Sequence, residues 1–138
     1  MQCVATTLAT LTKTDPDIFV GQLNTQDPCS WSRALTKWNM KLAYCPTDMR
    51  RLTHYMDELM DLDDLFTLSY YTSSYVDDIL SEPDERGWIT GSHIVILHRN
   101  LIFDSMSGTA VNALEHICNK YYTKRIFRVV PSSYPYGV

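Results

Sequence analysis

Residues 91–105 have the sequence GSHIVILHRNLIFDS, and this stretch decides the fold that we predict. Two short apolar runs surround the polar pair Arg99-Asn100, which is typical of a β-hairpin that turns at this pair. The turn sets four facing pairs: His98 with Leu101, Ile96 with Phe103, Val95 with Asp104, and His93 with Met106. Because side chains alternate along a strand, His93, Val95 and Asp104 share one face. His93 and Asp104 then lie diagonally across the hairpin, about 5.5–8 Å apart at Cβ.

Cys3 is the candidate nucleophile for this histidine and carboxylate. Residues 3–12 (CVATTLATLT) place Val4, Leu8 and Leu11 on one stripe, which predicts a helix that starts at or just before Cys3. Backbone N–H groups and the positive end of a helix dipole favour a thiolate at that position and can also stabilise an oxyanion. The three residues together supply the nucleophile, base and orienting group that acyl transfer needs.

Length and composition favour one globular domain over residues 1–138. The chain is 45% hydrophobic and 20% charged, which is ordinary for a globular protein. Its net charge of −4 argues against nucleic acid or an anionic membrane as the main partner. The sequence shows no secretion signal and no apolar run of about 20 residues, so we expect a cytoplasmic protein with reduced thiols.

The four cysteines form no CxxC pair and no zinc spacing. Cys29 is the rival nucleophile, because it also lies near a predicted helix start, although that helix carries two tryptophans typical of a core. Cys45 and Cys118 lie in apolar patterns and are expected to be buried. The other histidines, His54, His98 and His116, are interpreted as lying away from the site, with His54 and His116 on helix surfaces.

A metal site at the three candidate residues is a further alternative to catalysis. Zinc accepts sulfur, nitrogen and oxygen ligands, so Cys3, His93 and Asp104 are chemically able to bind it. No residue adds a fourth ligand by its spacing, and we therefore predict no metal and no cofactor.

The remaining segments alternate between helical and strand patterns. Helices are predicted from Asp15-Pro16 to about Leu23, over the period of Trp31 to Trp38 with Asp27 or Ser30 as cap, from Pro46-Thr47 into the acidic stretch 57–64, and over the period of Val111 to Tyr121. Strands are predicted over 40–45, 65–72 and 125–130, with Pro131 as a stop. Helices first and hairpin-connected strands afterwards indicate an α+β fold rather than a doubly wound parallel sheet.

The order of the motifs resembles the papain-like cysteine peptidase superfamily. Gln2-Cys3 opens a small-residue helix, Gly91-Ser92-His93 starts a strand, and Phe103-Asp104-Ser105 ends the next. The chain is most similar to compact bacteriocin-leader peptidases and their bacteriophage-encoded relatives, in which a Trp-bearing second helix and a short strand follow, as residues 31–44 do here. The resemblance implies a papain-like fold, with the nucleophile helix and further helices packed on an antiparallel sheet, and a bacterial or bacteriophage origin.

The resemblance also assigns roles to the three candidate residues. Cys3 is the nucleophile, His93 the general base and acid, and Asp104 the group that orients His93. In this superfamily an oxyanion-hole Gln usually lies several residues before the cysteine, whereas here Gln2 directly precedes Cys3 and is the candidate. Backbone N–H groups at the helix start are the alternative donors.

The expected function is hydrolysis of a peptide, isopeptide or amide bond through a thioester at Cys3, with a peptide or protein as substrate. Transglutamination or deamidation would use the same triad, and the acceptor that reaches the thioester decides between them. A catalytically weak binding protein on the same fold, which sequesters a host or partner protein, is an alternative from another class. A structural zinc-bearing module is the third.

An acidic stretch with aromatic neighbours precedes the hairpin. Asp77 and Asp78 begin it, and Tyr75 and Trp88 flank it. A solvated loop is the simpler interpretation. The alternative is a rim beside the site that selects a basic or extended peptide.

Overall fold

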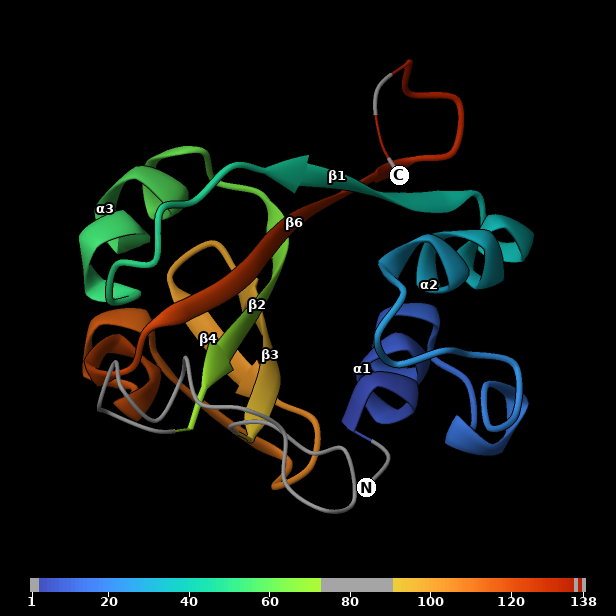
Figure 1. The fold of residues 1–138 in the computed structure, drawn as a ribbon, viewed down its shortest axis with the longest axis horizontal. Helices are drawn as coiled ribbons and strands as arrows, with labels where there is room; N and C mark the ends of the chain where they lie inside the picture. The colour runs from blue at the N-terminus through green and yellow to red at the C-terminus, as the bar shows by residue number, and fades with distance from the viewer. Residues whose placement is uncertain (1–2, 73–90, 136, 138) are drawn as a thin grey trace.

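The computed structural model describes residues 3–72, 91–135 and 137 as an α+β fold built on one antiparallel sheet (Figure 1). The six strands of this sheet lie in the order β1-β6-β2-β3-β4-β5. Their bounds are β1 Met40–Cys45, β2 Leu65–Tyr71, β3 Ser92–His98, β4 Leu101–Asp104, β5 Thr109–Asn112 and β6 Thr123–Pro131. The α-helices of the described residues are α1 Cys3–Thr12, α2 Pro28–Leu35 and α3 Thr53–Asp61. The predicted α+β class and antiparallel sheet are confirmed.

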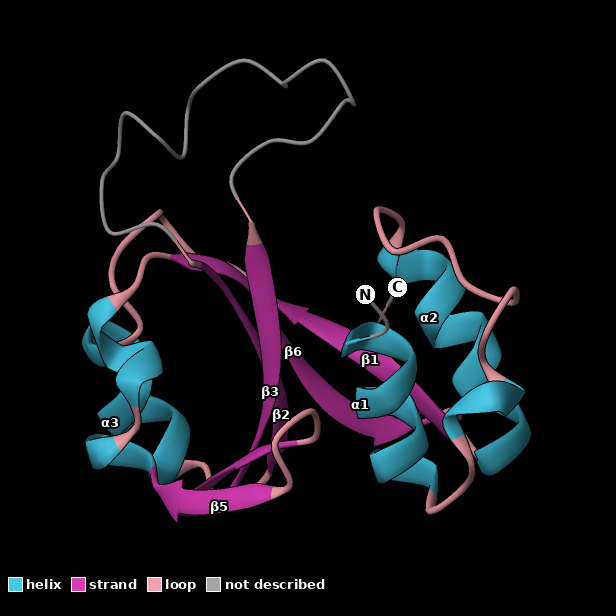
Figure 2. Cartoon of the chain, turned by 90° about the horizontal axis from the view of Figure 1, so that it is seen from below, coloured by secondary structure: helices cyan, strands magenta, loops and turns pink. Residues whose placement is uncertain are grey.

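The sheet separates two buried clusters. Figure 2 shows α1 and α2 on one side of the sheet and α3 on the other. Strand β3 contributes to both clusters, because its side chains alternate between the faces. Ile94 packs with the helix α1 cluster that includes Leu8 and Trp31, while Val95 and Leu97 pack with the α3 cluster. Residues of β3 are therefore fixed by packing on both sides.

The helix and the hairpin that carry the candidate triad are close to the prediction. Helix α1 covers Cys3–Thr12, and strands β3 and β4 pair His98 with Leu101 and Ile96 with Phe103. The ladder ends at that second pair, so the predicted facing pairs Val95–Asp104 and His93–Met106 are wrong. The physical reason is a turn at the end of β4, where the Asp104 carboxylate accepts the Met106 N–H and Gly108 donates to the Asp104 carbonyl.

The predicted helix over residues 111–121 is wrong. The chain instead forms strand β5, which pairs with β4, and two short 3₁₀ helices at Ala113–Glu115 and Ile117–Lys120. Leu114 and Ile117, which should face the core of a helix, are 58% and 55% exposed. The turn at Gly108, with a φ of 70°, directs the chain back along β4, and strand pairing then overrides the helical period.

Two other helices are shorter than predicted. Helix α3 begins at Thr53 rather than at Pro46, because the segment before it is irregular, with Met49 at a φ of 51°, and is bound to the residues that precede β6. Arg51 forms a bridge with Tyr122, and the Leu52 N–H donates to the Tyr121 carbonyl. The segment opened by Asp15 is one 3₁₀ turn, Pro16–Ile18, and does not extend as a helix to Leu23.

The other predicted elements are confirmed with small shifts. Asp27, rather than Ser30, is the cap of α2, since its carboxylate accepts the Cys29 N–H. Strands β1 and β2 have the predicted positions, and β6 includes Pro131 instead of ending before it. Within the described ranges, none of the helices is both long and apolar enough to cross a bilayer.

Candidate functional site

Three elements that are distant in the sequence bring the candidate triad together. Cys3 is the first residue of α1, His93 is the second residue of β3, and Asp104 is the last residue of β4. Helix α1 packs on β3 because Val4 and Ile94 are buried in one cluster. This packing sets the first turn of α1 beside the beginning of β3, and the thiol reaches the imidazole.

His93 interacts with both of its predicted partners. Its Nε2 lies 2.9 Å from Oδ2 of Asp104. A hydrogen bond with the Cys3 thiol is the strongest influence on the imidazole and raises the pKa of His93. Burial opposes this rise, while the hydrogen bond and charge of Asp104 add to it. The protonated imidazole is thus stabilised between a sulfur and a carboxylate.

Asp104 is held in place by the turn that it begins. One carboxylate oxygen, Oδ1, accepts the Met106 N–H at 3.0 Å, and the other contacts His93. The side chains of His93 and Asp104 are only 18% and 17% exposed, so water screens their pair weakly. Burial raises the pKa of Asp104, but the hydrogen bond and charge of His93 and the turn amides outweigh it and the net pKa is lowered. The Asp104 side chain can therefore stabilise the turn with one oxygen and contact His93 with the other.

Tyr70 is a buried neighbour of His93. It faces His93 across the β2–β3 ladder, and the two rings meet edge to face with centroids 5.8 Å apart. The other side of Tyr70 stacks on Tyr121 at 5.6 Å. Burial raises the pKa of Tyr70, which keeps its hydroxyl neutral. These contacts limit the rotation of the imidazole.

A second histidine lies close to the pair but has a different role. His116 was expected on a helix surface, and it is instead the half-buried cap of the 3₁₀ helix Ile117–Lys120. Its Nδ1 accepts the Cys118 N–H at 3.0 Å, which requires that nitrogen to be unprotonated. Burial lowers the pKa of His116, which favours its neutral form, whereas the pKa of His93 is raised. The charges of Asp104 and His93 both act on it.

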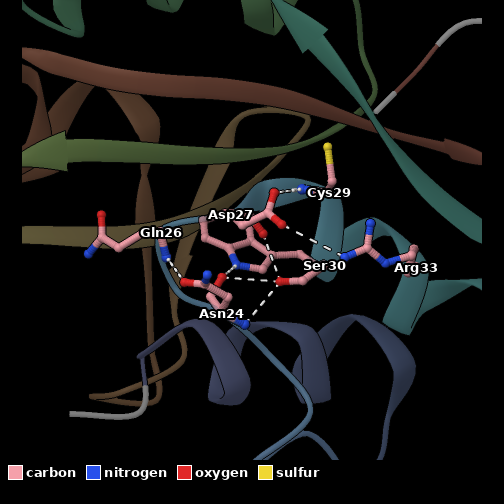
Figure 3. Close-up of polar contacts among 7 residues, drawn as sticks. Asn24, Gln26, Asp27, Cys29, Ser30 and Arg33 are labelled. Carbon is pink, nitrogen blue, oxygen red and sulfur yellow. Dashed lines mark hydrogen bonds and ion pairs between the residues drawn. The ribbon is translucent and has the colours of Figure 1, made fainter.

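The rival nucleophile Cys29 lacks a base. It lies at the start of α2, where its backbone N–H donates to Asp27 at 3.0 Å, and its sulfur points away from the polar network of Asn24, Asp27 and Ser30 (Figure 3). The Cys29 side chain is exposed. No hydrogen bond among the described side chains joins it to a histidine. Arg33, one turn later, forms an ion pair with Asp27 rather than with the sulfur.

The remaining thiols are shielded. Cys118 is buried as predicted, and burial raises its pKa to about 12. Cys45 is only partly buried, because it lies at the end of β1, and burial raises its pKa as well. The part of the chain that the structure describes holds no group of three His, Cys, Asp or Glu side chains arranged to bind a metal ion.

The other predicted site residues lie outside the described ranges. These are the oxyanion candidate Gln2 and the rim candidates Tyr75, Asp77, Asp78 and Trp88. A basic residue does lie near the thiol: the Nζ of Lys124 donates to the Ser92 hydroxyl at 3.2 Å, beside His93. The sequence carried no local signal for it.

The site has the parts that nucleophilic acyl transfer requires: a thiol at a helix start, an imidazole in hydrogen-bond contact with it, and a carboxylate that orients the imidazole. No protein-family model, curated protein or solved structure matches this chain. The function is therefore inferred from the geometry of the site itself.

Proposed function

We propose that this chain is a papain-like, thiol-dependent acyl-transfer enzyme, and specifically a cysteine peptidase or amidase. The observation that supports this most is the position of one imidazole between the Cys3 thiol and the Asp104 carboxylate. Asp104 engages Nε2, so Nδ1 is the ring nitrogen left for the thiol. Packing of a cysteine in a core does not require a histidine beside the thiol and a carboxylate beside that histidine.

The proposed reaction begins with a thiolate–imidazolium pair. The Cys3 sulfur attacks the substrate carbonyl carbon, and the imidazolium of His93 gives its proton to the departing amine, which leaves a thioester. His93 then takes a proton from water, the hydroxide attacks the thioester carbonyl, and the returning proton releases the Cys3 thiol. Asp104 keeps the ring oriented and stabilises its charged form throughout.

Developing negative charge on the carbonyl oxygen needs hydrogen-bond donors. Helix α1 begins at Cys3, and the unpaired N–H groups of a first helical turn point toward its start. Such donors stabilise an oxyanion and are worth several kcal/mol, roughly 3–4 for one donor in a well-studied peptidase. We propose these amides as donors, with the Gln2 side chain as an additional candidate.

The same triad serves hydrolysis, deamidation and transglutamination. The test must therefore show whether water or an amine attacks the thioester, and which carbonyl of the substrate formed it. We would incubate the protein with a peptide pool in water enriched in oxygen-18, with and without monodansylcadaverine, and analyse the products by mass spectrometry. Peptidase activity adds oxygen-18 to new C-terminal carboxylates. Deamidase activity adds it to side chains of former glutamines, and transglutaminase activity attaches the amine.

Cys3→Ser and Cys29→Ser are the matched variants. We expect all product formation to disappear in Cys3→Ser and to persist in Cys29→Ser. In parallel, iodoacetamide or a peptide vinyl sulfone should label Cys3 in preference to Cys29 at pH 6–7. If no product depends on Cys3 and its labelling is no faster than that of Cys29, the enzyme proposal is wrong and the binding-protein alternative takes its place.

A further inference from the structure

Two basic residues lie next to each other on β6, where its pairing with β2 changes register. Ser69 pairs with Arg125 and Tyr70 pairs with Thr123, so Lys124 is an extra residue in β6. An extra residue of this kind is a β-bulge, which interrupts the alternation of side chains along a strand. Lys124 and Arg125 can therefore face the same side of the sheet, although they are consecutive.

Their contacts lie on the side of the sheet that α1 covers. The Lys124 ammonium lies 5.8 Å from the ring centroid of Tyr71, and the Arg125 guanidinium lies 5.8 Å from that of Trp31. Trp31 belongs to the cluster against which Cys3 packs. The bulge thus adds two positive charges to the face that carries the thiol.

Lys124 is held against the beginning of β3. Its Nζ donates to the hydroxyl of Ser92, the residue that directly precedes His93 on β3. Burial and the charge of Arg125 lower the pKa of Lys124, and the charge of Cys3 opposes this shift in part. A lysine ammonium has three N–H donors, and only one has a hydrogen-bond partner among the described residues.

Lys124 and Arg125 differ from four arginines of the described residues, whose partners are carboxylates. Arg33, Arg50, Arg99 and Arg128 each form an ion pair with an aspartate. None of the ion pairs within residues 3–72 and 91–135 includes Lys124 or Arg125. A half-buried cation is stabilised by an anion beside it, and a substrate carboxylate is one group that can supply this charge.

We propose that Lys124 and Arg125 form a carboxylate-binding subsite beside Cys3, so that the preferred substrate carries an acidic side chain or a free C-terminal carboxylate next to the attacked bond. This proposal rests on the proposed function and deepens it. The proposed substrate is acidic. The acidic stretch before β3, considered alone, would instead favour a basic peptide. The source of the carboxylate, side chain or chain end, is left to the experiment.

The first test uses two alkylating reagents of nearly equal shape. Iodoacetamide is neutral and iodoacetate is an anion, and with both the thiolate forms an S–C bond while iodide leaves. The ratio of the two rates at Cys3 reports the local potential, because a change in the thiolate fraction affects both rates equally. We expect this ratio to be about 3–10 times higher at Cys3 than at Cys29, and to fall in 1 M salt.

Variants separate this subsite from the catalytic proposal. Lys124→Met and Arg125→Met should each lower the iodoacetate-to-iodoacetamide ratio at Cys3 by about 2–5 times. Lys124→Arg should retain the ratio, and Lys37→Met, a lysine on the 3₁₀ helix after α2, is the matched control. An unchanged ratio in both methionine variants overturns the subsite even when Cys3 reacts rapidly with iodoacetamide. If iodoacetamide labels Cys3 no faster than Cys29, the proposed function is wrong instead.

The second test identifies the carboxylate. Peptide vinyl sulfones with Asp or Asn before the electrophile test an acidic side chain, and an epoxysuccinyl peptide as free acid or amide tests a terminal carboxylate. At least one acid form should label Cys3 about 3–10 times faster than its neutral partner, and the advantage should vanish in Lys124→Met. Equal rates in both pairs would show that the cations do not contact substrate and would overturn the proposal.

Discussion

The two cysteines at helix starts, Cys3 and Cys29, show what makes a thiol a candidate nucleophile. Both lie in the first turn of a helix, where free amides favour a thiolate. At Cys29 the capping carboxylate of Asp27 accepts the Cys29 N–H, and no hydrogen bond among the described residues joins the exposed side chain to a histidine. At Cys3 the strand β3, which is distant in the sequence, supplies His93. A helix start is thus common, and the residue that the fold places opposite it decides its chemistry.

His93→Ala should cause the largest change in the reactivity of Cys3 relative to that of Cys29. Without the imidazole, Cys3 loses the partner that stabilises its thiolate and the group that transfers protons. We expect labelling of Cys3 by a peptide vinyl sulfone at pH 6 to fall by about 10²-fold, the lower end for a positioned acid–base group. Mass spectrometry of the labelled protein gives the rate at each cysteine.

Cys29 is the internal control for that experiment, because its rate should not change in His93→Ala. His116→Ala is the control for a lost histidine near the site, and it should change the rate at Cys3 by less than about 3-fold. Equal labelling of Cys3 with and without His93 would mean that the thiol is inert. The two helix starts would then be equivalent.

The parts of this comparison that were visible in the sequence are local. Helix α1 has a clear apolar stripe, and the hairpin turn at Arg99-Asn100 lies between two apolar runs, so both elements and the three triad residues could be predicted. Residues 111–121 have an equally clear helical period, and that prediction was wrong. Pairing with β4 outweighed the period there, because a strand edge offers hydrogen bonds that no local pattern reveals.

The neighbours of the triad could not be predicted for the same reason. Tyr70 meets His93 only through the β2–β3 register, and the two strands are separated by residues 72–91. The contact of Lys124 with Ser92 depends on a bulge, whose position is set by how β6 pairs with β2. Registers between distant strands are set by the whole sheet and leave no spacing signal in the sequence.

A smaller effect is expected from changing the Asp104 carboxylate. Asp104→Asn keeps the shape of the turn but removes the charge beside His93. The raised pKa of His93 stabilises the fold at pH values below about 6.5, its ordinary value, and this contribution is lost as pH rises through the raised pKa. The lowered pKa of Asp104 stabilises the fold above about 3.8, and this contribution is lost as pH falls through the lowered pKa.

The pair should therefore stabilise the protein most between pH 3.8 and 6.5. At pH 5 we expect Asp104→Asn to lower Tm by roughly 3–6 °C, from about 1 kcal/mol for a charge-assisted contact. The difference should shrink toward pH 8 and pH 2.5, as measured by circular dichroism. Asp63→Asn is the control, because its ion pair with Arg99 is 67–70% exposed. A Tm difference independent of pH would contradict the His93–Asp104 ion pair.

The smallest effect tests whether the Asp27 cap, rather than the missing histidine, lowers the reactivity of Cys29. Asp27→Ala removes the carboxylate that accepts the Cys29 N–H, which should lower the free energy of unfolding by about 1 kcal/mol. With that negative charge gone, the labelling rate of Cys29 should rise by no more than about 2–3-fold. Asp15→Ala, which removes the cap of a single 3₁₀ turn, is the control for a lost aspartate cap. If Cys29 in Asp27→Ala reacted as fast as Cys3, freeing a helix start would be sufficient for reactivity and His93 would not be the cause of the difference. A rate that stays well below that of Cys3 assigns the difference to the imidazole, because neither thiol then has a capping carboxylate from the described residues at its helix start.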